Sequence, residues 1–383
     1  MTAAIAHLER LVGFATVSRD SNLDLIDYVR AELAGLGIAS QMVASDDGRK
    51  ANLFATIGPA DRAGVVLSGH TDVVPCEGQA WTSDPFAVRR DNGRLYGRGT
   101  ADMKGFIACS LAMAREAVGR SLATPIHLAF SYDEEVGCIG VRRLLDMLSQ
   151  LPVRPRFCIV GEPTLMQVAT AHKGKASWRV VAHGLEAHSS LAPYGVNAIH
   201  LAVDLIGRIR AMQDEIAASG RRDGDYDVPF TTLHVGRIAG GETINIVPNR
   251  ASFDFELRYL PGDDEGEMFR RIEVAADEIA GAARARFAGA RLAFEPLVGY
   301  PALDTAPDEE VVAFVKSLTG ANATTKISFG TEGGLYQQRL GVPTVVCGPG
   351  AIAVAHKPDE YVEAAQLEAC TAFLARLIDR LAE

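Results

Sequence analysis

Four apolar runs before residue 170 show no alternation between apolar and polar side chains: residues 52–58, 65–69, 126–132 and 157–163. A strand that is apolar at every position is buried on both faces, as in a sheet that helices cover on both sides. Helical patterns separate the runs, among them residues 103–118 and 139–148. This alternation predicts an α/β domain with a central, mostly parallel sheet. A hairpin is expected within residues 86–99, turning on residues 91–93.

The pattern changes after about residue 172. A strand that alternates between apolar and polar residues begins near residue 174, and helices are expected at 195–213 and 263–286, with strands between and after them. The resulting order, βαββαβ, is typical of a ferredoxin-like α+β domain. A chain of 383 residues is also longer than a domain with a single hydrophobic core usually is. We therefore expect a domain of residues 173–296 inserted into a discontinuous domain of residues 1–172 and 297–383.

Composition excludes several classes of function. The formal net charge is −10 and the basic residues are scattered among acids, whereas nucleic-acid binding needs clustered Lys and Arg. No apolar run is long enough to span a membrane, and Glu9 and Arg10 interrupt the N-terminal apolar stretch, which predicts an amphipathic helix rather than a secretory signal. The six cysteines include no Cys-x-x-Cys pair, which favours free thiols in the cytoplasm. We expect a small-molecule ligand.

Acidic residues and a histidine follow the strands of the predicted sheet. The carboxyl ends of parallel strands form one edge, where open α/β sheets bind ligands. The residues expected there are His70, Asp72, Asp102, Asp133, Glu134, Glu135 and Glu162. Taken singly, a histidine after a strand is usually structural and an acidic pair is usually a solvated loop. Together they crowd negative charge into one place, which predicts a bound divalent metal as the counter-charge.

Six motifs resemble a known enzyme family. They are "SGHTDVVP" (68–75), "GRGTADMKG" (97–105), "SYDEEVGCIG" (131–140), "GEPT" (161–164), "GLEAHSS" (184–190) and "AHKPDEY" (355–361). They are similar to those of the zinc-dependent amidohydrolases, which include acetylornithine deacetylase, succinyl-diaminopimelate desuccinylase, aminoacylases and glutamate-releasing carboxypeptidases. The resemblance covers nearly the whole chain. It implies a zinc-peptidase-like catalytic domain with an inserted lid and dimerisation domain.

The resemblance implies two metal ions. Zn²⁺ is the favoured metal, and Co²⁺ and Mn²⁺ are alternatives because carboxylate-rich sites also accept them. The implied ligands are His70 and Glu162 on one ion and Glu135 and His356 on the other, with Asp102 bridging. Asp72 would orient the imidazole of His70. Glu134, left without a metal, would be the general base that carries a proton from water to the leaving amine. The Asp102–Met103 peptide is expected to be cis.

Other candidate residues come from the inserted domain and a late loop. In relatives of this kind, the residue matching His188 reaches into the partner subunit's active site, which implies a homodimer through the insert; the alternative is a local hydrogen bond. Apolar residues on the 195–213 helix, Ile199, Val203 and Ile206, agree with a dimer. Asn245 and Arg258 match positions that hold a substrate carboxylate, with a surface cation as the alternative for Arg258. The loop around Gly348 and Gly350 could add N–H donors.

Residues 329–350 and 355–362 resemble the acetylornithine deacetylase branch most. This implies hydrolysis of N2-acetyl-L-ornithine in arginine biosynthesis, with Glu332 as a candidate partner for the substrate ammonium. Acetylcitrulline, acetyl-lysine and succinyl-diaminopimelate stay open as substrates.

The sequence gives less support to two other classes of function, a nicotinamide-dependent enzyme and a non-catalytic binding protein. "GRGTAD" lacks the third glycine of a dinucleotide fingerprint, since that position is Asp102. A non-catalytic metal-dependent binding protein would be expected to lack Glu134, which is present. The remaining histidines receive no site role: His127, His200 and His234 are taken as structural, and His7, His172 and His183 are left unassigned.

Overall fold

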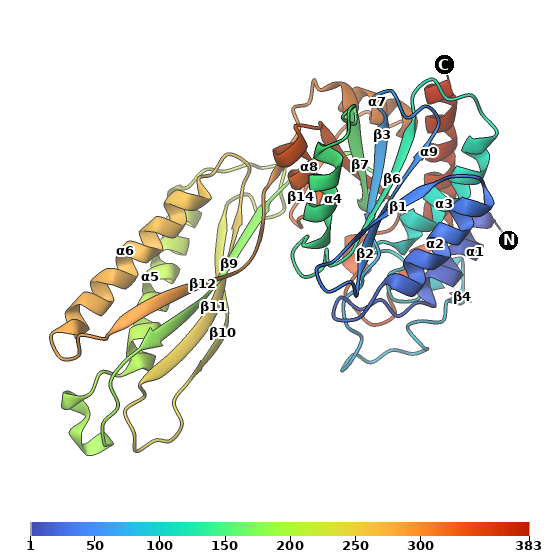
Figure 1. Ribbon diagram of the computed structural model, residues 1–383. Coiled ribbons are helices and arrows are strands. Elements are labelled where there is room, and N and C mark those ends of the chain that lie inside the picture. Colours follow the sequence, from blue (N-terminus) through green and yellow to red (C-terminus); the bar gives the residue numbers. More distant parts are fainter. Residues whose placement is uncertain (1, 383) are drawn as a thin grey trace. The chain divides into compact units, whose positions relative to one another are not determined.

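The computed structural model describes residues 2–382, which form two compact units (Figure 1). The first, the catalytic unit, contains the residues up to His172, Leu303–Lys326, and the residues from Thr331 onward. The second, the inserted unit, contains Lys173–Ala302 and Ile327–Gly330. No helix within residues 2–382 has both the length and the apolar character that crossing a bilayer requires.

A nine-stranded sheet is the centre of the catalytic unit, in the order β1-β2-β6-β3-β7-β15-β8-β13, with β14 paired to β8. The strands are β1 (Ser40–Ala44), β2 (Ala51–Ile57), β3 (Val65–His70), β6 (Ile126–Ser131), β7 (Phe157–Pro163), β8 (Ala169–His172), β13 (Leu303–Asp304), β14 (Thr325–Ile327) and β15 (Thr344–Gly348). The four central strands β6, β3, β7 and β15 run parallel, and the pairs β1–β2, β2–β6, β15–β8 and β8–β13 are antiparallel. The predicted α/β fold with a parallel centre is confirmed.

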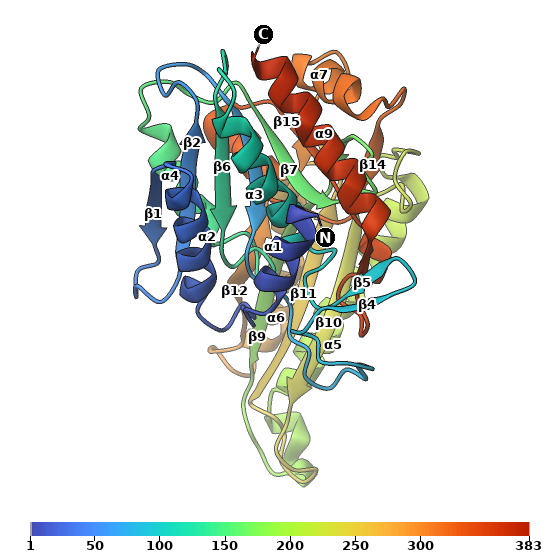
Figure 2. The same cartoon turned by 90° about the vertical axis from the view of Figure 1, so that its right-hand side faces the viewer.

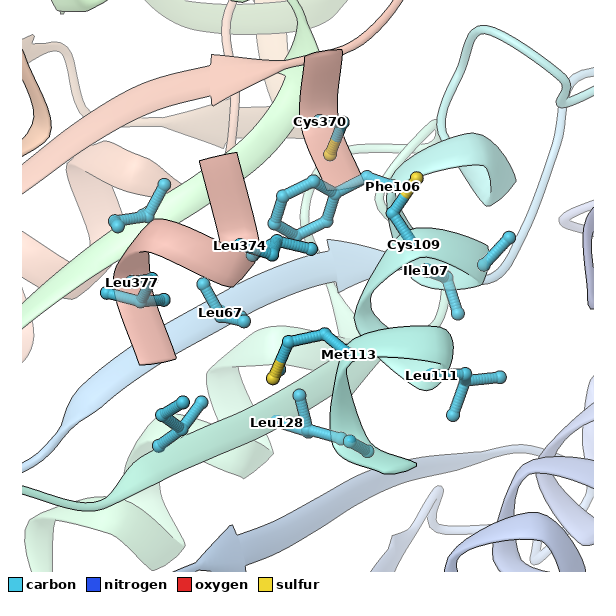
Figure 3. Close-up of a cluster of buried hydrophobic side chains, with 14 of the residues drawn as sticks. Leu67, Phe106, Ile107, Cys109, Leu111, Met113, Leu128, Cys370, Leu374 and Leu377 are labelled. Carbon is cyan, nitrogen blue, oxygen red and sulfur yellow. The ribbon is translucent and has the colours of Figure 1, made fainter. Parts of the chain in front are cut away.

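Helices cover both faces of this sheet (Figures 1 and 2). One face carries α1 (Ala3–Val12), α2 (Leu23–Gly35), α3 (Lys104–Val118), α7 (Glu310–Thr319) and α9 (Ala364–Ala382), and the other carries α4 (Gly140–Ser149) and α8 (Gly333–Leu340). Figure 3 shows the packing of α3 and α9 on β3 and β6, where Leu67, Phe106, Leu128 and Leu374 are fully buried. Each such side chain stabilises the fold by about 1.5–3 kcal/mol, which explains why most residues of these strands are apolar.

A smaller three-stranded sheet joins distant parts of the catalytic unit. It contains β4 (Arg89–Asp91), β5 (Arg94–Tyr96) and β16 (Tyr361–Glu363), with β5 in the centre. The predicted hairpin is confirmed: Asn92 and Gly93 both have positive φ, as a two-residue hairpin turn requires. The third strand was not predicted, and it places the segment after His356 beside the segment before Asp102.

The inserted unit is a four-stranded antiparallel sheet with two helices packed on one face. In chain order it contains β9 (Gly174–His183), the 3₁₀ turn η1 (Ser189–Tyr194), α5 (Ala198–Ser219), β10 (Thr232–Gly240), β11 (Arg250–Tyr259), α6 (Glu265–Arg284) and β12 (Arg291–Tyr300). This is the predicted βαββαβ order, and the sheet order is β10-β11-β9-β12. The unit continues past residue 296, because β12 pairs with β9 as far as Tyr300.

The apolar residues of α5 are more buried than the sequence suggested. Ile199 and Ile206 pack against the core of the inserted unit, and of the three residues singled out Val203 alone is exposed, at 50%. A helix beside a four-stranded sheet and a second helix buries a wider stripe than a helix on the sheet alone. The exposed apolar surface of α5 is therefore smaller than the sequence pattern of residues 195–213 predicts.

Candidate metal centre

The parallel strands of the catalytic unit bring acidic residues and a histidine to one edge of the sheet. His70 is the last residue of β3 and lies opposite Ser131, the last residue of β6. Asp133, Glu134 and Glu135 follow directly after β6, and Glu162 lies near the end of β7, which pairs with β3 on its other side. The edge is the one at which open α/β sheets bind ligands.

The first group of candidate ligands is His70, Asp102 and Glu162, all buried. The Nε2 atom of His70 lies 3.0 Å from Asp102 Oδ1 and 3.5 Å from Glu162 Oε1. One ligand atom from each residue lies within 4.8 Å of the other two. An imidazole and two carboxylates at this spacing can hold one divalent ion.

The second group is Asp102, Glu135 and His356. His356 Nε2 lies 3.2 Å from Asp102 Oδ2 and 3.0 Å from Glu135 Oε2. Asp102 thus presents Oδ1 to one imidazole and Oδ2 to the other, which is the arrangement of a carboxylate that can bridge two ions. The predicted cis peptide between Asp102 and Met103 is confirmed.

The charges of this edge are not balanced by the protein alone. Burial and the neighbouring carboxylates raise the pKa of Glu134 to about 8 and that of Glu162 well above its usual range. Burial and Asp102 raise the pKa of Glu135 to about 7. Hydrogen bonding to Asp102 and Glu135 raises the pKa of His356 to about 10. Every one of these shifts reflects a need for positive charge, and divalent ions between the two groups would supply it.

Asp72 has two functions in the centre, one more than the sequence predicted. Its backbone carbonyl accepts a hydrogen bond from His70 Nδ1 at 2.9 Å, and its carboxylate Oδ1 lies 3.6 Å from the same nitrogen, which leaves Nε2 facing the other carboxylates. Its carboxylate accepts from the backbone N–H groups of Glu134 at 3.1 Å and Glu135 at 3.3 Å, and from Ser18 Oγ at 2.7 Å. Asp72 therefore contacts the imidazole through its main chain and, at a longer distance, through its carboxylate, and it holds the acidic loop through its side chain.

A lysine that the sequence did not single out also holds the acidic loop. Lys50 Nζ forms an ion pair with Asp133 at 2.6 Å, and it donates to the backbone carbonyl of Ser18. Asp133 has positive φ, so the chain turns sharply immediately before Glu134. The side chain of Glu134 accepts from Cys138 Sγ at 3.4 Å and belongs to neither of the two ligand groups.

Glu332 lies inside the catalytic unit and is fully buried. Its carboxylate accepts hydrogen bonds from Ser131 Oγ and, at 3.2 Å, from Ser68 Oγ. Both oxygens therefore have partners, one from within β3 and one from the end of β6, and the role of Glu332 as the partner of a substrate ammonium stays a prediction.

The N–H groups of Gly348 and Gly350 are also engaged within the catalytic unit. Gly348 N donates to Thr164 Oγ1 at 3.2 Å and Gly350 N to Gln366 Oε1 at 3.3 Å. Both N–H groups therefore have partners within the unit, and their role as donors to the substrate stays a prediction. Gly348 also permits close packing, because a Cβ atom there would lie 2.0 Å from the carbonyl oxygen of Gly161.

Three candidate residues lie in the inserted unit. His188 is exposed, and its Nδ1 hydrogen-bonds Ser190, the local alternative considered for it. Asn245 is exposed and accepts from Thr243 Oγ1 at 2.9 Å. Arg258 donates to Glu256 at 3.1 Å and to the hydroxyl of Tyr300 at 2.9 Å. Their roles toward a substrate stay predictions.

Known proteins resemble the chain along nearly its whole length. Residues 66–380 match the family model described as Peptidase family M20/M25/M40. The chain is 36% identical over 383 residues to an acetylornithine deacetylase from Myxococcus xanthus, covering 99% of this chain and 97% of that protein. At this identity and coverage the two chains share a family.

Solved structures agree on the fold. An M20 family metallo-carboxypeptidase from Sulfolobus solfataricus has a TM-score of 0.81 at 18% identity, with 100% of this chain and 99% of that chain covered. A dinuclear metal binding peptidase of the M20 family from Bacillus subtilis has a TM-score of 0.69 at 16% identity, with 99% and 97% covered. The chain therefore belongs to Peptidase family M20/M25/M40 and is a metal-dependent hydrolase of that family.

Proposed function

We propose that this enzyme hydrolyses the N-acyl amide of an amino acid, and that its principal substrate is N2-acetyl-L-ornithine, which water converts to L-ornithine and acetate in arginine biosynthesis. The proposal depends most on the surroundings of Asp102. Its two carboxylate oxygens face two different imidazoles, and Glu134 lies nearby but belongs to neither ligand group. The identity to the acetylornithine deacetylase supports the choice of acyl group and amino acid.

In this proposal the protein holds two divalent ions, with Zn²⁺ as the favoured metal. The ligands are His70, Asp102, Glu135, Glu162 and His356. When bound, they would polarise the amide carbonyl and acidify a water molecule. Co²⁺ and Mn²⁺ are the alternatives for the same donor set.

Glu134 carries the proton. It accepts a proton from the attacking water and gives it to the amide nitrogen, so that the C–N bond breaks and the amine leaves neutral. Asp72 and the Lys50–Asp133 ion pair fix the backbone on both sides of Glu134, which keeps its carboxylate at one place relative to His70 and Asp102. Arg258 is proposed to bind the α-carboxylate of the amino acid, with Asn245 beside it.

A homodimer through the inserted unit is part of the proposal, and His188 would act in the partner subunit's centre as a donor to the developing oxyanion. Exposed apolar side chains on the inserted unit support it, among them Val203 and Ile238, the latter on the edge strand β10. All six cysteines are free, and five are buried, which supports a cytoplasmic location.

The test is a panel of N-acyl amino acids with the zinc-loaded and the chelated protein. N2-acetyl-L-ornithine should give the highest kcat/KM, above acetylcitrulline, acetyl-lysine and succinyl-diaminopimelate, and chelation should abolish turnover of all four. If another member of the panel is preferred by tenfold or more, the named substrate is wrong and the amidohydrolase chemistry stands.

A further inference from the structure

An ion pair between Arg98 and Glu360 is fully buried at both ends within the catalytic unit. Arg98 Nη1 lies 2.7 Å from Glu360 Oε2, and the two side chains are 1% and 0% exposed. Removing two charges from water costs as much as the pair regains, so a buried ion pair is weak evidence of a contribution to stability. The contacts that the pair makes with the backbone indicate another role.

Glu360 holds the segment that carries the bridging candidate Asp102. Its Oε1 atom accepts from the backbone N–H of Ala101 at 3.0 Å and from the backbone N–H of Asp102 itself at 3.1 Å. The backbone carbonyl of Glu360 in turn accepts from Gly97 N at 2.9 Å. The position of Asp102 is therefore set by a residue 258 positions later in the sequence.

Arg98 holds the segment that carries His356. Its Nη1 also donates to the carbonyl of Lys357 at 3.4 Å, and its Nη2 donates to Gln79 Oε1 at 2.6 Å. Gln79 links Arg98 to His356, because its Nε2 donates a hydrogen bond to the backbone carbonyl of His356 at 2.8 Å. The backbone of His356 has positive φ, a conformation that a non-glycine residue keeps only when its surroundings hold it.

We propose that Arg98, Glu360 and Gln79 form a positioning clamp that fixes the separation of Asp102 and His356, and thereby builds the metal subsite of Asp102, Glu135 and His356. The clamp touches neither substrate nor reacting atoms. It acts by joining two loops that the sequence places far apart, with β5 and β16 as the backbone connection between them. A buried charge pair suits this task, because its donors and acceptors satisfy backbone groups that an apolar pair would leave without partners.

The inference rests on the proposed two-ion centre, and its test uses Zn²⁺ itself as the probe. The full-length protein is freed of metal and titrated with Zn²⁺ against a chelator, and crystals of the loaded protein are examined by anomalous diffraction. Wild-type protein should bind two ions. Glu360→Gln, which keeps the shape but removes the charge, should weaken one of the two affinities by about 10–100-fold, as loss of groups that orient metal ligands generally does. At limiting free Zn²⁺ the anomalous signal should be reduced beside Glu135 and His356 and kept beside His70 and Glu162.

Two further variants separate positioning from a general loss of folding. Gln79→Ala leaves the ion pair in place and removes the hydrogen bond to the carbonyl of His356, so it should weaken the same subsite while the melting temperature of the metal-free protein stays within a few degrees. Glu9→Gln breaks the exposed Glu9–Arg90 pair and should leave both affinities unchanged.

The outcomes are distinct. Wild-type protein with two ions, but unshifted affinities in both Glu360→Gln and Gln79→Ala, overturns the clamp alone. Equal weakening of both subsites in Gln79→Ala also overturns it, because the clamp would then not be specific to His356. Wild-type protein with fewer than two ions contradicts the proposed function and the clamp with it.

Discussion

At the scale of single residues, Glu134 carries the proposed proton transfer. It follows Asp133, whose positive φ and ion pair with Lys50 fix the turn, and its N–H group is bound by Asp72. Burial beside other carboxylates raises its pKa to about 8 in the metal-free protein, and bound cations would lower that pKa again. A carboxylate under such opposed influences can titrate near the operating pH, as a general base must.

Replacing Glu134 with Gln should lower kcat about 10²–10⁴-fold, the usual contribution of general acid–base catalysis, with little change in KM or in bound zinc. Steady-state kinetics and metal analysis of the same preparation measure this. Glu273→Gln, an exposed change on α6, is the matched control and should leave all three quantities unchanged. Unaltered turnover in Glu134→Gln would contradict its role as the general base.

Sequence motifs predicted the residues of the centre better than its supports. His70, Asp102, Glu135, Glu162 and His356 lie together as expected. Arg98 and Glu360 stand in the same motifs, four residues before Asp102 and four after His356, yet their pairing spans 262 positions and no local pattern reveals it. The surroundings of Glu332 could not be predicted for a similar reason, because spacing along the chain does not show that Ser68 and Ser131 donate to its carboxylate.

At the scale of elements, strand β6 contains a buried ionisable group. His127 is 6% exposed, stacks on Phe54 with ring centroids 5.3 Å apart, and hydrogen-bonds Thr56 Oγ1 at 2.9 Å. Burial lowers its pKa to about 4, from an ordinary value of 6.5. Between those two values the unfolded chain binds a proton that the folded chain does not, so the stability of the catalytic unit falls as the pH falls from 6.5 to 4.

His127→Gln removes this dependence. On lowering the pH from 7 to 5, the wild-type protein should lose roughly 2 kcal/mol more unfolding free energy than the variant, from the difference between the two pKa values. Urea unfolding of both proteins at the two pH values gives the difference directly. Parallel losses in the two proteins would show that His127 is protonated as easily in the fold as outside it.

The pairing of β15 with β7 depends on the absence of a side chain at Gly348. A Cβ atom there would lie 2.0 Å from the Gly161 carbonyl, a backbone group that has no room to move within the sheet. Gly348→Ala should therefore destabilise the catalytic unit by about 1–3 kcal/mol or more. Gly35→Ala is the control, since nothing lies within 4 Å of its new Cβ, and it should leave the melting temperature unchanged or raise it. Equal melting temperatures for both variants would contradict the packing argument.

Long buried elements were predictable and short ones were not. β3, β6 and β7 are buried at every position, so their apolar runs identify them. β13 and β16 have only two and three residues and exist because a neighbouring strand offers a free edge. The tertiary structure, not the local sequence, decides such pairings.

At the scale of the whole molecule, the proposed homodimer assigns two parts of one active site to different chains. Glu134 would come from one subunit and His188 from its partner. This division can be tested without knowing how the subunits are arranged, because a mixed dimer of two inactive variants would contain one intact centre.

Glu134→Gln and His188→Ala proteins should each be nearly inactive. After unfolding and joint refolding they should regain about one quarter of the wild-type activity, since half of randomly formed dimers are mixed and each has one intact site of two. Mixing without refolding is the control and should restore much less. Absence of any gain, with a dimer seen by sedimentation, would place His188 outside the partner's centre.

The central claim is that two divalent ions bind at the shared carboxylate of Asp102. Anomalous diffraction from crystals of the zinc-loaded enzyme tests it most directly. The account predicts two peaks about 3.5–4 Å apart, one beside His70 and Glu162 and one beside Glu135 and His356, with Asp102 contacting both. A single peak, or peaks that do not touch Asp102, would contradict it.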